Sequence, residues 1–182
     1  MAEFFVEHRV NSIEHRLAPA DIARVRVRTF AAAASLTRIP PRNTEEAQYN
    51  LAFPVAAALL DGAVGPAQVL PPRLFDRDVL ELAARLDVEV APEFEARFPA
   101  KAIASVEITA RDGRRFDSGA VEARWEPPDT LPSDDELREK FVWLVGPVLG
   151  RDRALELMGS IWGFDRVADA RQLIALAMVD SR

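Results

Sequence analysis

Apolar and polar residues alternate along the first third of the chain in a pattern that predicts one strand and one central helix. Residues 22–29 place Arg24, Arg26 and Arg28 on one side and mainly alanine and valine on the other. A period of two is typical of a half-buried strand. Residues 47–65 form the most apolar stretch, and a helix that is apolar all round is buried on several sides. We expect residues 47–65 to be the central helix on which the rest of the chain packs.

The ends of this central helix are marked by capping signals. Asn43 is followed three residues later by Glu46, which is a helix-start pattern, and Gly62 to Gly65 can end the helix. Pro54 lies within the apolar pattern. Because proline lacks the amide donor and clashes with the preceding turn, we expect the helix to break or kink there.

The segment after this helix predicts a second helix, a short strand and then a hairpin. The helix spans residues 76–86, and residues 88–90 form the strand. Residues 101–124 alternate with period two around Asp112–Gly113, a pair that favours a tight hairpin turn. The apolar positions change parity in the returning strand, which predicts a bulge at Ser118–Gly119.

From about residue 130 onwards the pattern predicts helices only. A capping box at residues 133–136 opens a helix that ends at Gly150 at the latest, or already at Gly146–Pro147. Residues 151–162 predict another helix, and Asp165 is the expected cap of a last one.

These elements give an α+β fold in which a small, mostly antiparallel sheet has helices packed on one face and a C-terminal helical segment follows. We expect an α+β domain at residues 1–130 and the helical segment at residues 131–182. Residues 1–17 predict a helical lead-in, and residues 31–35 predict a small-residue continuation of the first strand.

The composition of the chain excludes several classes of function but does not identify a particular one. The 182 residues carry a net charge of −6, which argues against a general nucleic-acid or membrane-surface binder. The chain has no cysteine, which excludes disulfides, thiolate metal sites and cysteine nucleophiles. The N-terminus does not have the pattern of a signal peptide, so we expect a cytoplasmic protein.

The residues that bear chemistry form no complete active site by themselves. His8 and His15 lie two helical turns apart, too far for a shared metal, and no phosphate-loop or dinucleotide motif is present. We therefore expect no metal and no cofactor. The three arginines of residues 22–29 are either a carboxylate-binding face or, as we favour, an ordinary solvated strand face. Tyr49 is expected in the core.

Residues 41–65, PRNTEEAQYNLAFPVAAALLDGAVG, resemble the MmgE/PrpD family, whose members include 2-methylcitrate dehydratase and cis-aconitate decarboxylase. The family pattern is A-x-[FY]-S-[LI]-x-[YF]-x-[VA]-A-x-A-L-L-D-G, and Asn50 stands at its serine. Residues 131–141, LPSDDELREKF, resemble the family's P-[LM]-S-D-x-E-[LV]-x-x-K-F helix start. Residues 21–29 and 110–115 resemble its strand and hairpin, so the resemblance covers about residues 21–178.

The resemblance implies a lid-like α+β domain at residues 1–130, followed by helices that return to a large helical domain in family enzymes. Most residues that abstract protons and bind carboxylates lie in that helical domain. For this chain the resemblance implies His8 as the catalytic candidate, although strict spacing places the family's histidine nearer Val10. Phe53 is the substrate-binding candidate, at a position where cis-aconitate decarboxylase has a tyrosine, and Arg24 is a second such candidate.

Three functions remain open at this point. The first is a lyase component that acts on a small polycarboxylic acid together with a separately encoded helical-domain partner. The second is a stand-alone repurposed isomerase or cyclase, and the third is a non-catalytic binding or assembly protein. Because the C-terminal helices carry many apolar side chains, we expect a homodimer or a heteromer.

Overall fold

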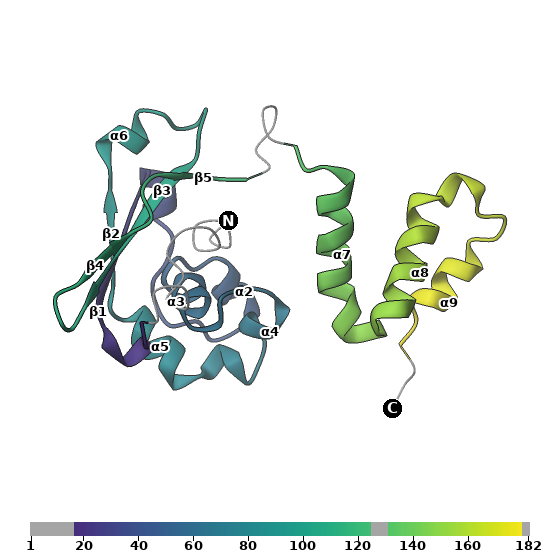
Figure 1. The fold of residues 1–182 in the computed structure, drawn as a ribbon, viewed down its shortest axis with the longest axis horizontal. Coiled ribbons are helices and arrows are strands. Elements are labelled where there is room, and N and C mark those ends of the chain that lie inside the picture. The colour runs from purple at the N-terminus through teal and green to yellow at the C-terminus, as the bar shows by residue number, and fades with distance from the viewer. Residues whose placement is uncertain (1–16, 125–130, 180–182) are drawn as a thin grey trace. The chain divides into compact units, whose positions relative to one another are not determined.

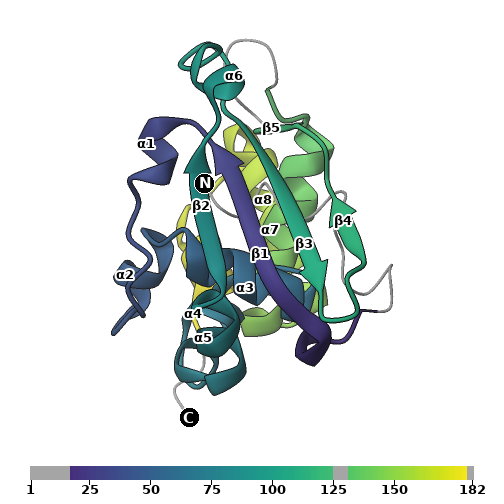
Figure 2. The same ribbon diagram turned by 90° about the vertical axis from the view of Figure 1, so that its left-hand side faces the viewer.

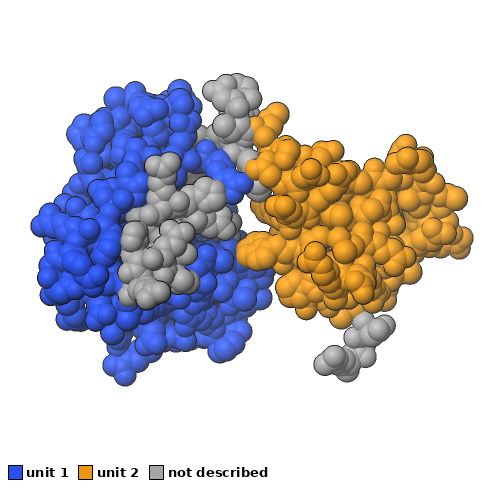
Figure 3. Space-filling view, viewed as in Figure 1, with its two compact units in different colours: residues 1–126 blue, residues 127–182 orange. Residues whose placement is uncertain are grey.

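The computed structural model describes residues 17–124 and 131–179. The chain divides into two compact units, an N-terminal unit of residues 1–126 and a C-terminal unit of residues 127–182 (Figure 3). Each unit has its own set of elements and is described by itself.

The N-terminal unit is built on one five-stranded, mostly antiparallel sheet, as the sequence predicts (Figures 1 and 2). The strand order is β2-β1-β3-β4, and β5 also pairs with β3. Strand β1 pairs with β2 in parallel and with β3 antiparallel, and β4 and β5 both run antiparallel to β3. The strands are β1 (Ile22–Thr29), β2 (Leu86–Val90), β3 (Ile103–Ala110), β4 (Arg115–Asp117) and β5 (Val121–Glu122).

The hairpin formed by β3 with β4 and β5 has the predicted turn at Asp112–Gly113, and its returning strand is irregular at the predicted position, Ser118–Gly119. Gly113 has a φ of 88°, a left-handed conformation that glycine adopts without strain. The returning strand is interrupted between β4 and β5, where Gly119 has a φ of 65°. Here the Ser118 hydroxyl accepts a hydrogen bond from the Val106 amide at 2.9 Å, which replaces the missing ladder contact.

The predicted central helix is two helices, and the break precedes Pro54. Helix α2 (Thr44–Gln48) ends before Tyr49, and α3 spans Ala52–Asp61 and ends at Gly62, whose φ is 75°. Pro54 is the third residue of α3, where an amide has no partner within the helix, so proline costs nothing there and produces no break. The prediction for Tyr49 is also wrong, because its side chain is exposed at the end of α2.

Short helices connect the remaining elements of this unit. Residues 31–34 form helix α1 (Ala31–Ala34) and do not continue the strand, because alanine favours helix over strand. The predicted second helix is present as α5 (Arg77–Ala83), whose first turn is capped by the Asp76 carboxylate. The other helices are α4 (Pro66–Val69) and α6 (Pro92–Glu95), with 3₁₀ turns at Pro19–Asp21 and Arg73–Phe75.

The core of the N-terminal unit lies between the sheet and helices α3 and α5. Val25 and Val27 of β1 and Ile108 of β3 contribute to it from the sheet. Eight of the ten residues of α3 are buried, which agrees with the all-round apolar pattern of this segment. Helices thus cover one face of the sheet, and the arginines of β1 lie on its other face.

The C-terminal unit contains three α-helices in the described residues 131–179: α7 (Asp134–Leu149), α8 (Arg151–Trp162) and α9 (Arg171–Ala177). The predicted capping box opens α7, with the Ser133 hydroxyl accepting from the Glu136 amide. Helix α7 continues through Gly146–Pro147 and ends at Gly150. Asp165 lies in a 3₁₀ turn, and it is the Asp169 carboxylate that accepts the Arg171 amide at the start of α9, so that predicted cap is wrong.

This C-terminal unit buries little of its own apolar surface. Among its described residues, Ala154 and Leu157 are buried, whereas ten large apolar side chains are exposed. No helix in the described part of the chain is both long and apolar enough to cross a membrane. The exposed apolar residues of the unit are Leu131, Leu137, Trp143, Val148, Leu155, Ile161, Phe164, Ile174, Met178 and Val179.

Candidate functional site

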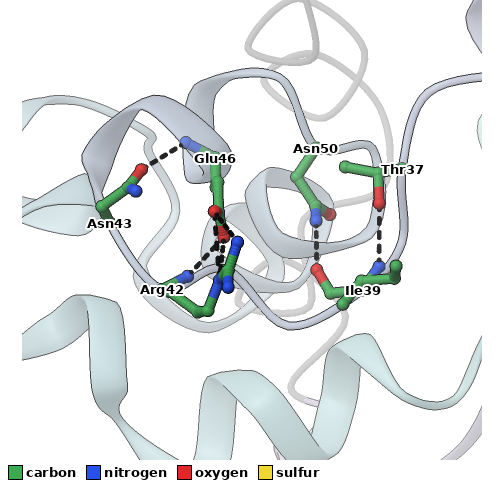
Figure 4. A network of polar contacts seen from close by, with 6 residues as sticks. All are labelled: Thr37, Ile39, Arg42, Asn43, Glu46 and Asn50. Carbon is green, nitrogen blue, oxygen red and sulfur yellow. Dashed lines mark hydrogen bonds and ion pairs between the residues drawn. The ribbon is translucent and has the colours of Figure 1, made fainter.

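A buried asparagine joins the proline-rich loop at residues 37–42 to the start of helix α3. The Asn50 side chain is 1% exposed. Its carbonyl oxygen accepts the Phe53 amide at 2.8 Å. Its amide donates to the Ile39 carbonyl at 2.7 Å, as Figure 4 shows. A bridge between Thr37 and Asn50 fixes the same two segments. Asn50 therefore holds the loop in one position against the first turn of α3.

The other end of the loop is held by the cap of helix α2. The Asn43 side chain accepts the Glu46 amide at 2.8 Å, as the capping signal predicts. The Glu46 carboxylate in turn accepts from the Arg42 amide at 2.9 Å and from its guanidinium at 2.7 Å (Figure 4). These hydrogen bonds from Arg42 lower the pKa of Glu46, so the carboxylate is fixed in its charged form at neutral pH.

Phe53 lies in the core of the N-terminal unit. It is the second residue of α3, and its side chain is fully buried in the cluster that also contains Val25 and Val27. A phenyl ring has no proton to donate, so this position supplies shape and no acid–base group. In the loop itself, Ile39 and Arg42 are exposed.

Arg24 and its neighbours on β1 already have carboxylate partners within the chain. The Arg24 guanidinium pairs with Asp87 of β2. Arg28 bonds to Glu89 and Glu93 at 2.8 Å each, and both contacts raise its pKa. Arg26 approaches Glu107 of β3 at 3.8 Å. Since Phe53 packs on the covered face of the sheet and Arg24 lies on the other face, the two substrate-binding candidates do not share one surface.

Arg38 is an arginine of the loop at residues 37–42 that was not among the candidates from the sequence, which were the arginines of residues 22–29. It lies in the loop that Asn50 holds, and its side chain is exposed and has no ion pair within residues 17–124 and 131–179. The strand arginines gain their carboxylate partners from residues far away in the sequence. No local signal could have singled out Arg38, since Arg26 and Arg28 likewise have no acidic residue within four positions in the sequence.

The remaining candidate cannot be placed. His8 lies outside the described residues, as does His15. Across the described ranges, no three histidine, aspartate or glutamate side chains gather in a way that could hold a metal ion.

Comparison with known protein families gives one match that covers most of the chain. Residues 9–163 match the model of the MmgE/PrpD C-terminal domain. A comparison with curated proteins gave no match.

Proposed function

The chain belongs to the MmgE/PrpD family, and from that membership we propose that it is a lyase component that acts on a small polycarboxylic acid. The observation that carries the proposal is the family match, which spans the sheet, the loop at residues 37–42 and helices α3, α7 and α8. A separate helical-domain protein supplies the opposite wall of the site and most of the substrate contacts.

The reaction is an elimination in which this chain mainly binds and orients the substrate. A base removes the proton from the carbon next to a carboxylate, and the electrons of that C–H bond form the new C=C bond. The hydroxyl on the neighbouring carbon takes a proton and leaves as water. Negative charge develops on the carboxylate during proton removal, so a cation placed there stabilises the transition state.

Arg38 is the residue that we assign to this carboxylate. Its guanidinium is free of internal carboxylates in the described chain, whereas Arg24 would have to leave Asp87 to bind a substrate. A guanidinium binds a carboxylate through two parallel hydrogen bonds. Arg24 remains a second candidate and His8 is the proposed base. Phe53 is fully buried, so its part in substrate binding is indirect, through the packing of the first turn of α3.

The test is co-expression with an MmgE/PrpD-type helical-domain protein, followed by assay of the purified complex with citrate and 2-methylcitrate. We expect the two proteins to co-purify and the complex to form a product with a new C=C bond. Arg38→Gln should lower kcat/KM roughly 10- to 100-fold, since a charge-assisted hydrogen bond that strengthens in the transition state is lost. Arg77→Gln on α5 is the control, because that exposed side chain pairs with Glu81 one turn away, and it should leave kcat/KM unchanged.

Two results would count against the proposal. One is turnover by the chain alone that is unaffected by His8→Gln, which would favour a repurposed enzyme. The other is the absence of both co-purification and turnover, which would favour a non-catalytic binding protein.

A further inference from the structure

Strand β2 forms one edge of the sheet in the N-terminal unit. It pairs with β1 on one side, and no strand of the described residues pairs with its other side (Figure 2). Helix α1 lies near its C-terminal end. An edge strand presents backbone N–H and C=O groups to which a further strand can bind. The outer side of β2 is therefore a place where this sheet can be extended.

The hydrogen bonds at the two ends of β2 show which of its residues bond to β1. The Val25 amide donates to the Arg85 carbonyl at 3.3 Å, and the Ala91 amide donates to the Thr29 carbonyl at 2.8 Å. Arg85 and Ala91 directly precede and follow β2. Because alternate residues of a strand bond to the same neighbour, residues 87 and 89 also bond to β1.

The other three residues of β2 face away from β1. The N–H and C=O groups of Leu86, Val88 and Val90 are consequently directed to the open edge. Within residues 17–124 and 131–179, no group forms a hydrogen bond with them. The Val90 side chain is 46% exposed, so an apolar contact is available beside them. Three donors and three acceptors in a row match the backbone of one extended segment.

The opposite edge of the sheet does not offer such a row. Strand β4 has three residues, and the chain is interrupted at Ser118–Gly119 before β5. Short and interrupted edge strands resist pairing with other chains. Strand β2 is continuous over five residues. Of the two edges, β2 is thus the one suited to bind another strand.

Acidic side chains on and after β2 define the chemistry of the segment that fits. Asp87, Glu89 and Glu93 share two guanidinium groups, those of Arg24 and Arg28. Asp87 and Glu89 each use one carboxylate oxygen in these contacts, and the second oxygen accepts no hydrogen bond within the described ranges. Since a carboxylate accepts hydrogen bonds on both oxygens, each can bind one more basic side chain.

The same carboxylates disfavour pairing with a second copy of β2. In an antiparallel two-fold contact centred on Val88, Asp87 of one copy lies opposite Glu89 of the other. Like charges directly opposite each other destabilise a strand pair. A strand in which basic and apolar residues alternate avoids this repulsion, and β1 is such a strand on the inner side of β2.

We propose that the outer edge of β2 binds an extended segment of a partner protein, in which basic and apolar residues alternate, as an added strand. The outward backbone groups of Leu86, Val88 and Val90 pair with the segment's backbone. Basic side chains of the segment bind Asp87 and Glu89. This site goes beyond the proposed function and does not depend on it, since it uses neither the loop at residues 37–42 nor the C-terminal unit.

A synthetic peptide with the sequence of β1, IARVRVRT, is the probe, because it has the pattern that already pairs with β2. Its ends are blocked, and an attached fluorophore reports binding to the full chain by anisotropy. A second peptide carries glutamate in place of the three arginines. We expect it to bind at least about tenfold more weakly, because its carboxylates would lie beside Asp87 and Glu89.

Two variants of the chain separate the backbone contribution from the charge contribution. Val88→Pro removes the central outward N–H and leaves the ladder to β1 intact, since proline is tolerated where an edge N–H faces solvent. It should raise the dissociation constant about tenfold, and its urea midpoint reports whether the fold is kept. The double variant Asp87→Asn/Glu89→Gln keeps the backbone groups. It should raise the dissociation constant about threefold to tenfold and weaken its salt dependence.

The matched control is Glu107→Gln. Glu107 pairs with Arg26 on the same face of the sheet, but it lies on β3, which has strands on both sides. The dissociation constant of this variant should equal that of the wild type.

Residue-specific amide exchange distinguishes an added strand from binding elsewhere. The peptide should slow exchange of the Leu86, Val88 and Val90 amides, while the Asp87 and Glu89 amides, already bonded to β1, should not change.

Four outcomes would overturn the proposal. The arginine peptide could fail to bind, or the glutamate peptide could bind equally well. Val88→Pro could leave the dissociation constant unchanged while protection appears outside β2. The wild-type chain could also self-associate in a way that Val88→Pro abolishes, which would identify a second copy as the occupant.

Discussion

The N-terminal and C-terminal units of this chain differ in how far each buries its own apolar residues. In the N-terminal unit, one continuous core joins β1, β3, α3 and α5, and eight of ten residues in α3 are buried. In the C-terminal unit, the described residues bury Ala154 and Leu157 and leave ten large apolar side chains exposed. Both units are regular in secondary structure, so the difference lies in packing and not in local propensity.

The difference shows that capping signals and helical periodicity do not reveal whether the apolar face of a helix is buried within its own unit or left exposed. Helix α7 has a capping box and an amphipathic pattern, but part of its apolar surface lines an open groove. Helix α3 has no side-chain cap of its own and is held by tertiary contacts and by Asn50. Apolar faces as large as those of the C-terminal unit are uncommon on monomers, and this is the reason that we expect a homodimer or a heteromer.

The largest expected effect comes from removing the same side chain in the two units. Leu59→Ala in α3 deletes a fully buried leucine and should lower the free energy of unfolding by about 2 to 5 kcal/mol. Leu155→Ala in α8 deletes a leucine that is 39% exposed, and in dilute protein it should cost less than about 1 kcal/mol. Urea unfolding followed by far-ultraviolet circular dichroism measures both.

Equal losses in the free energy of unfolding for Leu59→Ala and Leu155→Ala in dilute protein would contradict the proposed difference between the two units. Near-equal losses would mean that Leu155 is packed as tightly as Leu59 within a single chain. A loss for Leu155→Ala that appears only in concentrated protein would sharpen the comparison, because it would assign the leucine to contacts between copies.

A smaller effect is expected at Asn50, which links the loop to the core of the N-terminal unit. Asn50→Ala leaves the Phe53 amide and the Ile39 carbonyl without their partner and should cost about 2 to 3 kcal/mol. Asn50→Ser keeps an acceptor for Phe53 but cannot reach Ile39, so the cost should be about 1 to 2 kcal/mol. Urea midpoints of the two variants and the wild type provide the measurement, and equal midpoints would show that the loop is not held by this side chain.

The smallest effect is expected in the pH dependence of the N-terminal unit. Hydrogen bonds from Arg42 lower the pKa of Glu46 below its ordinary value of 4.5, so the charged form stabilises the fold above that value. This contribution is lost as the pH falls through the lowered pKa. Glu46→Gln should therefore flatten the decline of the urea midpoint below pH 4.5. A Glu46→Gln profile that superimposes on the wild type would contradict this assignment.

Local signals in the sequence determined much of the N-terminal unit. The alternation of residues 22–29 predicts β1, and Asp112–Gly113 and Ser118–Gly119 predict the turn and the interruption of the hairpin. These features depend on period two and on glycine conformations, which act over a few residues. The α+β class and the mostly antiparallel sheet follow from the same signals.

Features that depend on tertiary contacts could not be predicted from the pattern. The break between α2 and α3 falls at Asn50, whose side chain bonds to a loop eleven residues earlier, and the pattern indicated Pro54 instead. The parallel pairing of β1 with β2 places Asp87 and Glu89 beside the arginines of β1. Ion pairs with these carboxylates offset the positive charge of Arg24 and Arg28, which the sequence of β1 alone does not indicate. Family resemblance indicated Phe53 as a substrate-binding residue, whereas the apolar pattern around it predicted burial, and the fold agrees with the pattern.

Hydrogen exchange tests most directly whether the C-terminal unit depends on a second copy or on a partner protein to cover its apolar residues. The amides of α7 and α8 should become more protected as the protein concentration rises or when the helical-domain protein is added, because association suppresses local opening. The amides of β1, β3 and α3 should exchange at the same rate throughout. Equal protection of α7 and α8 under all these conditions would contradict the account, since the unit would then be complete within one chain.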